Sequence, residues 1–331
     1  MKRPLFVFAG QSNMMGAPVF PAKEQIYYKN SSEYLHKRRR LGESRGVFKT
    51  YGLPVGEFSY SDLKKAYGEN YTPDSISATG EYGESTLFAP SLCNLKDEAA
   101  KTMYDFSYFN ESNPRLAPSM PAYIVKGLED NGYCCAYTHI AKGGVPIKYY
   151  LDGKPFDYFA EKTLAFFEEA EEKYKEDDTS EKIFVWHQGE SDRDKTIEYY
   201  KDALYKLWDK CKKLGFTKFF MVRVGYWCDD DTFKIMEAQE AFCKECPDAY
   251  MITRAASFIP WHDKKDSDLF TVTPEEELTF CRDTFYGYGN CHINEKGFKY
   301  IAKYAAPNII RVAFQNTEPI LEEERCKLLI D

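Results

Sequence analysis

The sequence predicts an α/β fold in which helices cover both faces of a central parallel sheet. Short apolar runs that are typical of buried strands alternate along the chain with longer segments typical of helices. Strands joined through a helix run parallel to one another. The chain has 331 residues, of which 44% are hydrophobic, so it can bury a large core. We expect a single domain over residues 1–331.

Each expected element follows from its local composition. Strands are expected in the short runs rich in apolar, β-branched and aromatic residues: Leu5–Ala9, Cys134–Ile140, Ile183–Trp186, Phe219–Val224 and Ala249–Ile252. Helices are expected in the longer intervening segments: Ser119–Asn131, Phe156–Lys175, Ile197–Leu214, Phe233–Lys244 and Glu295–Phe314. The first helix is closed by the stop signal Asn131-Gly132. The second is amphipathic, with Phe159, Phe166 and Phe167 near one face.

Two long segments do not fit this alternation. Residues 21–115 are polar and rich in Tyr, Ser, Gly and Asn, and residues 259–290 are similarly irregular. Loops of this length are usually functional or carry small elements of their own. We expect both to be insertions that lie over the carboxyl edge of the sheet and shape a substrate pocket.

Composition narrows the classes of partner. The net charge of −8 argues against nucleic acid, because phosphate binding needs basic patches. No apolar run approaches the ~20 residues of a membrane span, and the run after Met1-Lys2-Arg3 is too short for a signal peptide. We therefore expect a cytoplasmic protein whose cysteines are reduced. Cys243-Lys244-Glu245-Cys246 has no second C-x-x-C to pair with, so packed thiols are expected there.

Two polar blocks directly follow the first two expected strands. Gly10-Gln11-Ser12-Asn13 places a serine where the first strand ends, and it differs from the G-x-S-x-G elbow because Met14 occupies the fifth position. Ala141-Lys142-Gly143-Gly144 follows the second strand, and paired glycines let backbone N–H groups approach a ligand closely. A tight turn also needs such glycines, so this block is weak evidence alone.

Two further blocks complete a candidate site. The segment Trp186–Asp192 reads W-H-Q-G-E-S-D and follows the third expected strand, and Cys291–Gly297 places His292 just before the last helix. The carboxyl ends of parallel strands meet at one edge of a sheet, where ligands bind. A serine, an oxyanion-binding turn and a histidine at that edge supply a nucleophile, hydrogen-bond donors and a general base. This combination predicts acyl transfer.

Together the blocks resemble a known family. Gly10–Met14, Gly143-Gly144, His187–Asp192 and His292–Gly297 are similar to the signature blocks of the SGNH-hydrolase superfamily. The most similar branch is the sialate O-acetylesterase and carbohydrate esterase family 6 group, which includes acetyl xylan esterases. The blocks come in the family's order and span nearly the whole chain. The resemblance implies a flavodoxin-like α/β/α sandwich of three layers and a serine esterase that removes O-acetyl groups from sugars without a metal or other cofactor.

The resemblance also implies roles for single residues. Ser12 is the nucleophile and His292 the general base. The oxyanion hole is formed by the backbone N–H groups of Ser12 and of Gly144 or Gly143, together with the side-chain amide of Gln188.

Substrate contacts are expected from Gln11, Asn13, Gly143 and Arg254. A sialic acid carries a carboxylate, which calls for a cationic partner. Four arginines in loops or at strand ends are available for it: Arg115, Arg223, Arg254 and Arg282.

Two positions depart from the family pattern. Many members carry Asp three residues before the histidine, where this chain has Gly289. The acid that orients His292 is therefore open: Glu190 is the first candidate, Asp283 the second, and a Ser–His dyad without an acid the third. Val145-Pro146 replaces the usual small polar pair after the glycines, at a loop expected to contact the sugar.

Several readings of the function stay open. An O-acetylated sialic acid is the first substrate candidate, and acetylated xylan or another acetylated oligosaccharide is the second. A lipase or thioesterase of the same fold would need an apolar channel, which the polar, Tyr-rich segment 21–115 disfavours. A sugar-binding protein on a scaffold that has lost catalysis is the non-enzymatic alternative. The expected partner is thus a small acetylated carbohydrate, with no nucleic acid and no membrane.

Overall fold

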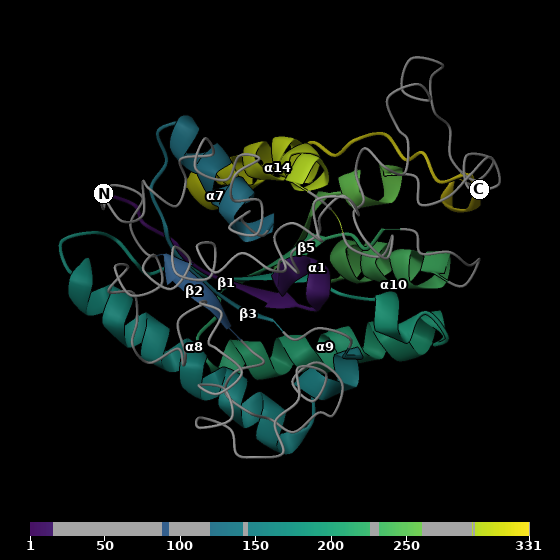
Figure 1. Ribbon diagram of the computed structural model, residues 1–331, viewed down its shortest axis with the longest axis horizontal. Coiled ribbons are helices and arrows are strands. Elements are labelled where there is room, and N and C mark those ends of the chain that lie inside the picture. Colours follow the sequence, from purple (N-terminus) through teal and green to yellow (C-terminus); the bar gives the residue numbers. More distant parts are fainter. Residues whose placement is uncertain are drawn as a thin grey trace, which may run out of the picture.

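The computed structural model describes residues 1–15, 88–92, 120–141, 145–225, 232–259, 293 and 295–330. These residues form three layers, with a six-stranded sheet between two layers of helices (Figure 1). The strands are β1 (Leu5–Gly10), β2 (Phe88–Leu92), β3 (Ala136–Ala141), β4 (Lys182–His187), β5 (Lys218–Val222) and β6 (Ala249–Thr253). The helices used below are α1 (Ser12–Met15), α7 (Met120–Asp130), α8 (Gly153–Lys173), α9 (Ile197–Lys213), α10 (Thr232–Glu245) and α14 (Glu295–Ile309).

The order of the strands confirms the predicted parallel α/β/α sandwich. The sheet runs β2-β3-β1-β4-β5-β6, and all neighbouring pairs except β2–β3 are parallel. Numbered along the chain, the parallel strands lie in the order 2-1-3-4-5, which is the flavodoxin-like doubly wound arrangement. The direction of winding reverses between β1 and β4. In such sheets the crevice at the carboxyl ends of the two strands at the reversal is where ligands bind.

One strand lies where the sequence predicted an irregular insertion. The five residues of β2 fall within segment 21–115 and pair antiparallel with β3, with Phe88 opposite Ile140 and Leu92 opposite Tyr137. Pro90 lies within this strand, where the pairing with β3 shifts register, and proline in a strand is confined to edges or bulges because it cannot donate to the ladder. An antiparallel strand at the edge of a parallel sheet is common. The rest of segment 21–115, and residues 260–290, lie outside the described residues.

Aromatic side chains join one face of the sheet to three helices. Phe184 of β4 lies 5.8 Å, between ring centroids, from Phe159 of α8. Phe219 of β5 lies 5.7 Å from Trp208 of α9 and 5.1 Å from Phe242 of α10. These rings are buried, and T-shaped pairs at such distances add to the free energy gained from burial alone. Helices α8, α9 and α10 are thereby fixed on this face.

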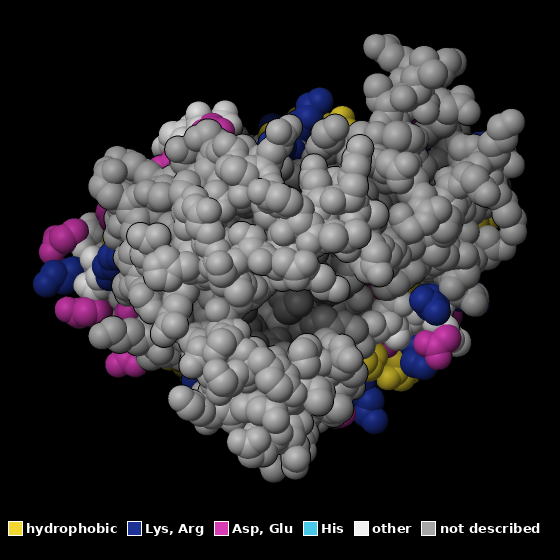
Figure 2. All heavy atoms as spheres, viewed as in Figure 1, with side chains coloured by type: hydrophobic (Ala, Val, Ile, Leu, Met, Phe, Trp, Pro, Cys, Tyr) yellow, Lys and Arg dark blue, Asp and Glu magenta, His cyan; other side chains and the backbone are white. Residues whose placement is uncertain are grey.

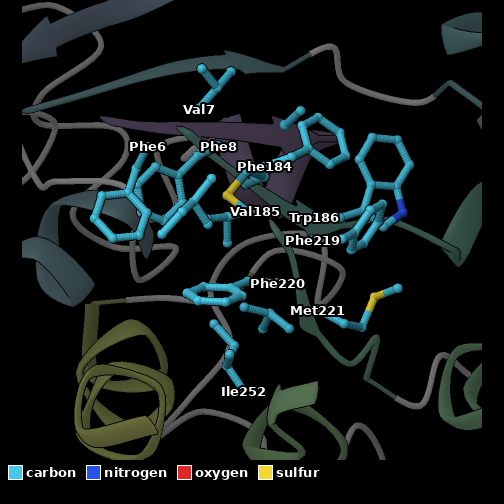
Figure 3. Close-up of a cluster of buried hydrophobic side chains, with 14 of the residues drawn as sticks. Phe6, Val7, Phe8, Phe184, Val185, Trp186, Phe219, Phe220, Met221 and Ile252 are labelled. Carbon is cyan, nitrogen blue, oxygen red and sulfur yellow. The ribbon is translucent and has the colours of Figure 1, made fainter. Parts of the chain in front are cut away.

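The opposite face of the sheet packs against α7 and α14. Phe6 of β1 and Phe220 of β5 are fully buried and lie 6.4 Å apart between ring centroids. Figure 3 shows Phe220 and Ile252 pointing toward the yellow helix, which is α14. Side chains thus alternate between two apolar layers along each strand, as expected when both faces of a sheet are covered. The two layers hold the carboxyl ends of β1 and β4 in place.

The observed ends of the elements differ from the expected ones by a few residues. Helix α9 begins after Thr196, whose hydroxyl oxygen accepts a hydrogen bond of 3.1 Å from the backbone N–H of Tyr199. Such a cap satisfies one of the free N–H groups of the first turn. The last helix was expected to reach Phe314; its α-helical part ends at Ile309 and a π-helical turn follows. Pro307 lies two residues before that end and lacks the N–H that an α-helix needs.

The surface and the thiols add little to the site. In Figure 2, acidic and basic side chains alternate along the left margin of the molecule without forming a patch of one sign.

Cys243 and Cys246 are free thiols, and burial raises the pKa of Cys246. None of the helices in the described part of the chain has the length and apolar character needed to span a bilayer.

Candidate active site

The first and third sequence blocks meet where β1 and β4 end. The two strands are neighbours, and Gly10 at the end of β1 lies opposite His187 at the end of β4. Ser12 begins the short helix α1 one residue after β1 ends, and Gln188–Asp192 follow β4 directly. This is the point at which the winding of the sheet reverses, so both blocks lie at the crevice that the fold itself provides.

Two glycines of the blocks are required by the close approach of these chain segments. Gly10 has a φ of +147°, and a Cβ there would lie 2.0 Å from the backbone oxygen of His187. Gly189 has a φ of +156°, and a Cβ there would lie 2.5 Å from the Cγ2 of Ile235 on α10. Residues with side chains rarely adopt such backbone angles, and neither position has room for a methyl group. Both glycines are therefore required for the chain to follow the observed path where it leaves β1 and β4.

The buried side chain of Gln188 connects the first and third blocks and reaches Val145, the residue directly after the second block. Its Nε2 donates to Oδ2 of Asp192 at 2.7 Å, and it lies 3.1 Å from the carbonyl oxygen of Val145 and 3.2 Å from Oε1 of Gln11. Its Oε1 accepts from the hydroxyl of Tyr200 at 2.8 Å. The amide thus has acceptors for both its hydrogens within the protein. The assignment of Gln188 to the oxyanion hole stays a prediction. To stabilise an oxyanion, the amide would have to give up one of these hydrogen bonds.

Asp192 holds the segment that follows the paired glycines. Its Oδ2 accepts both the Gln188 amide and the backbone N–H of Ile147, the latter at 2.6 Å. Burial raises the pKa of Asp192, and the two hydrogen bonds oppose only part of that shift. Gly143 and Gly144 themselves lie outside the described residues. The contacts to Val145 and Ile147 nevertheless tie the chain directly after them to the end of β4.

The raised pKa of Asp192 predicts how its stability contribution depends on pH. Because the folded protein holds this proton more tightly than the unfolded chain, the contribution is complete below the ordinary pKa of 3.8. It is lost as the pH rises through the folded pKa. An amide at this position keeps an oxygen for both donors, as a protonated carboxyl group does. We expect Asp192→Asn to match the wild type at low pH and to become the more stable protein as the pH rises, measured by urea unfolding from pH 3 to 7.

Asp194 is the matched control for this series. It is exposed, and the hydrogen bond from Lys195 lowers its pKa. The stability difference of Asp194→Asn should be small and should run in the opposite direction with pH. A constant difference between Asp192→Asn and the wild type over the whole range would contradict the raised pKa.

The side chain of Asn13 connects the first, third and fourth blocks. Its Nδ2 donates to Oε1 of Glu190 at 3.0 Å. Its Oδ1 accepts the backbone N–H of Ile293 at 2.9 Å, across 280 positions of sequence. Asn13 is buried, and both ends of its amide are engaged in the protein. The side chain of Ser12 and all of His292 lie outside the described residues.

Glu190 is a buried carboxylate with one oxygen available. It begins the short 3₁₀ helix Glu190–Asp192, and only 4% of its surface is exposed. Its Oε1 receives the Asn13 amide, whereas its Oε2 has no hydrogen-bond partner among the described residues. The Nε2 of His187 lies 3.7 Å from Oε1 and likewise lacks a partner within the described part of the chain. A buried acceptor without a donor is costly, so this oxygen is a candidate for a functional contact.

Two tyrosines that the sequence did not single out support the blocks. The hydroxyl of Tyr150 donates to the carbonyl oxygen of Gly10 at 2.6 Å. The hydroxyl of Tyr200 lies 2.7 Å from the carbonyl oxygen of Gln188, and burial raises its pKa well above the ordinary value. Both lie in helical segments, where a tyrosine is an ordinary core residue. No local signal separates them from the other aromatic residues of the chain.

Arg254 lies farther along the sheet and is engaged in ion pairs. It follows β6, three strands from β1. Its Nε and Nη2 pair with both oxygens of Glu240, at 2.7 and 2.9 Å, and its Nη1 donates to the carbonyl oxygen of Glu322. Arg223 is fully buried between Glu240 and Glu324. The expected substrate contact of Arg254 stays a prediction, and a substrate would have to compete with these glutamates.

Comparisons with known proteins give little further information. No family model matches the chain, and no curated protein sequence matches it. A protein of Arabidopsis thaliana known from its X-ray structure is 11% identical with a TM-score of 0.44, and the match covers 93% of this chain and 97% of that one. A family 3 carbohydrate esterase of Clostridium thermocellum is 10% identical with a TM-score of 0.38, and the match covers 60% and 89%. At these scores neither likeness supports an assignment of activity.

Proposed function

We propose that this protein is a serine carbohydrate esterase that removes O-acetyl groups from sugars. The observation that carries the proposal is the buried hydrogen bond between Asn13 and Ile293. Asn13 directly follows Ser12, and Ile293 directly follows His292. The bond therefore joins the neighbours of a hydroxyl and an imidazole that are far apart in sequence, at the crevice where a ligand is expected.

The chemistry is acyl transfer through a covalent intermediate. His292 takes the proton of Ser12 as the Oγ attacks the acetyl carbonyl carbon. The resulting oxyanion is stabilised by the backbone N–H groups of Ser12 and Gly144 and by the Gln188 amide, each worth roughly 3 kcal/mol. The imidazolium returns the proton to the departing sugar oxygen, so the sugar leaves as its alcohol. His292 then activates water, which releases acetate and regenerates Ser12.

Glu190 is the acid that we assign to His292. Its carboxylate is buried, Asn13 holds one of its oxygens, and the other lacks a donor among the described residues. Asp283 lies outside the described residues, and a dyad without an acid is the remaining alternative. If Glu190 orients the imidazole, Glu190→Gln should lower kcat with little effect on KM.

Two classes of sugar compete as the substrate. An O-acetylated sialic acid remains the first candidate from the sequence, and its carboxylate needs a cation in the pocket. At the ends of β5 and β6, Arg223 and Arg254 are already paired with glutamates. A neutral sugar needs no such cation. The second candidate is therefore a neutral acetylated oligosaccharide, such as an acetylated xylo-oligosaccharide.

A panel of esters tests the proposal. Acetate release is measured from O-acetylated sialic acid, acetylated xylo-oligosaccharide and p-nitrophenyl acetate, and acid release from p-nitrophenyl octanoate. We expect turnover of at least one acetylated sugar and a kcat/KM for p-nitrophenyl acetate at least about tenfold above that for the octanoate. A preference for the longer acyl chain would indicate a lipase or thioesterase instead. Binding of an acetylated sugar without any release of acetate would indicate the non-enzymatic alternative.

A further inference from the structure

We propose that His187 is a positioning residue that fixes the carboxylate of Glu190 in the orientation needed by the catalytic imidazole. The inference rests on the esterase function proposed above. His187 ends β4, one strand away from the serine block, and its side chain is fully buried. It belongs to the third block but takes no part in the steps of acyl transfer themselves.

The hydrogen bond at Nδ1 determines where the imidazole carries a proton. Nδ1 of His187 lies 3.1 Å from the carbonyl oxygen of Val222. A carbonyl oxygen can only accept, so Nδ1 carries the hydrogen of this bond. The other ring nitrogen, Nε2, then lies 3.7 Å from Oε1 of Glu190 and has no hydrogen-bond partner among the described residues.

A hydrogen between His187 and Glu190 would turn their close approach into a favourable contact. A neutral imidazole with its hydrogen on Nδ1 presents a lone pair at Nε2, and a carboxylate oxygen also presents lone pairs. Two buried acceptors that face each other are unfavourable. A hydrogen carried by Nε2 and donated to Oε1 satisfies both atoms and leaves Glu190 as the carboxylate that the catalytic imidazole needs. Closing the gap from 3.7 Å to a hydrogen bond of ~2.8 Å needs a movement of only about 1 Å.

The contact completes a series of buried side-chain contacts that runs from the sheet to the fourth block. Val222 ends β5, so its carbonyl oxygen is fixed by the sheet. From there the series leads through His187 to Glu190. It continues through Asn13 to the backbone N–H of Ile293. Oε1 of Glu190 accepts the Asn13 amide on one side and faces Nε2 of His187, 3.7 Å away, on the other. Oε2 has no partner among the described residues, and it is the oxygen that the proposed mechanism assigns to the catalytic imidazole.

Two substitutions of His187 separate its two contacts. An asparagine amide can take the place of Nδ1 and donate to Val222, whereas a glutamine amide can take the place of Nε2 and donate to Glu190. We expect His187→Asn to lower kcat for p-nitrophenyl acetate by roughly 10- to 100-fold with KM unchanged, because the orienting carboxylate loses a support. His187→Gln should restore kcat to within about threefold of the wild type. Equal losses of kcat in both variants would overturn the proposal.

A double-mutant cycle with Glu190→Gln tests whether His187 acts through Glu190. If it does, adding His187→Asn to Glu190→Gln should lower kcat no further, whereas independent effects would multiply and overturn the proposal. The same cycle is measured by urea unfolding, which needs no activity. A non-additive shift of the urea midpoint is expected even if the wild type hydrolyses none of the esters, so failure of the proposed function is distinguished from failure of this contact. Additive shifts would overturn the contact itself.

Discussion

Ser12→Ala lowers acetate release by at least about a thousandfold and leaves the fold intact, if Ser12 is the nucleophile. The substitution removes only the oxygen that forms the acyl intermediate. The backbone N–H of residue 12 remains, so part of the oxyanion hole is preserved and a small residual rate is expected. His292→Ala should cause a loss of similar size, because the two residues act as one unit. The rates are measured with p-nitrophenyl acetate and with the best acetylated sugar of the panel.

A serine at the opposite edge of the sheet is the control for this experiment. Ser180 is exposed, lies before the start of β4 and hydrogen-bonds to Asp178. Ser180→Ala should keep the wild-type rate. Unchanged circular dichroism and an unchanged urea midpoint in Ser12→Ala would show that its loss of rate is not a loss of fold. Retention of more than a tenth of the rate by Ser12→Ala would rule out this serine as the nucleophile.

Gly10→Ala should destabilise the protein by about 2–6 kcal/mol. Holding a residue with a side chain in this sparsely populated backbone region costs roughly 1–3 kcal/mol. The added methyl group would also lie 2.0 Å from the backbone oxygen of His187, and overpacking of this kind costs a further 1–3 kcal/mol. The neighbouring atom belongs to a central strand and cannot move as a side-chain tip can. The free energy of unfolding in urea measures the loss.

Gly153→Ala is the matched control. Gly153 is the first residue of α8, and a Cβ there would meet no atom within 4 Å. Since alanine loses less conformational entropy on folding than glycine, this variant should equal the wild type or gain up to about 1 kcal/mol. Equal stability of Gly10→Ala and Gly153→Ala would contradict the close approach of Gly10 to the backbone of His187.

The sequence was sufficient for the parallel part of the fold. The core strands are continuous apolar runs bounded by helices, so local composition determines both their existence and their approximate ends; Lys218–Val222, for example, was expected as Phe219–Val224. The strand β2 could not be predicted in the same way. Its five residues include Pro90, and only pairing with β3, a partner distant in sequence, makes them a strand.

For the site, residue types were predictable but their connections were not. The Gly10 block and the His187–Asp192 block were expected at one edge of the sheet, and they meet there. Asn13 was expected to contact substrate, and that contact stays a prediction. Its hydrogen bond to Ile293 was not foreseen, because the two residues are 280 positions apart and no local pattern indicates such a contact. Arg254 was expected to contact substrate because a sialate carboxylate calls for a cation, and its ion pair with Glu240 was not foreseen. Its partners lie on α10 and near the end of the described chain, beyond the reach of a local pattern.

Reaction with a fluorophosphonate, followed by mass spectrometry of the digested protein, locates the nucleophile itself. We predict a single adduct on Ser12 in the wild type, and little or none in His292→Ala, where the hydroxyl has no base. An adduct on a different residue, or an active enzyme that takes up no label, would show that the serine after β1 and the histidine before α14 do not form one catalytic centre.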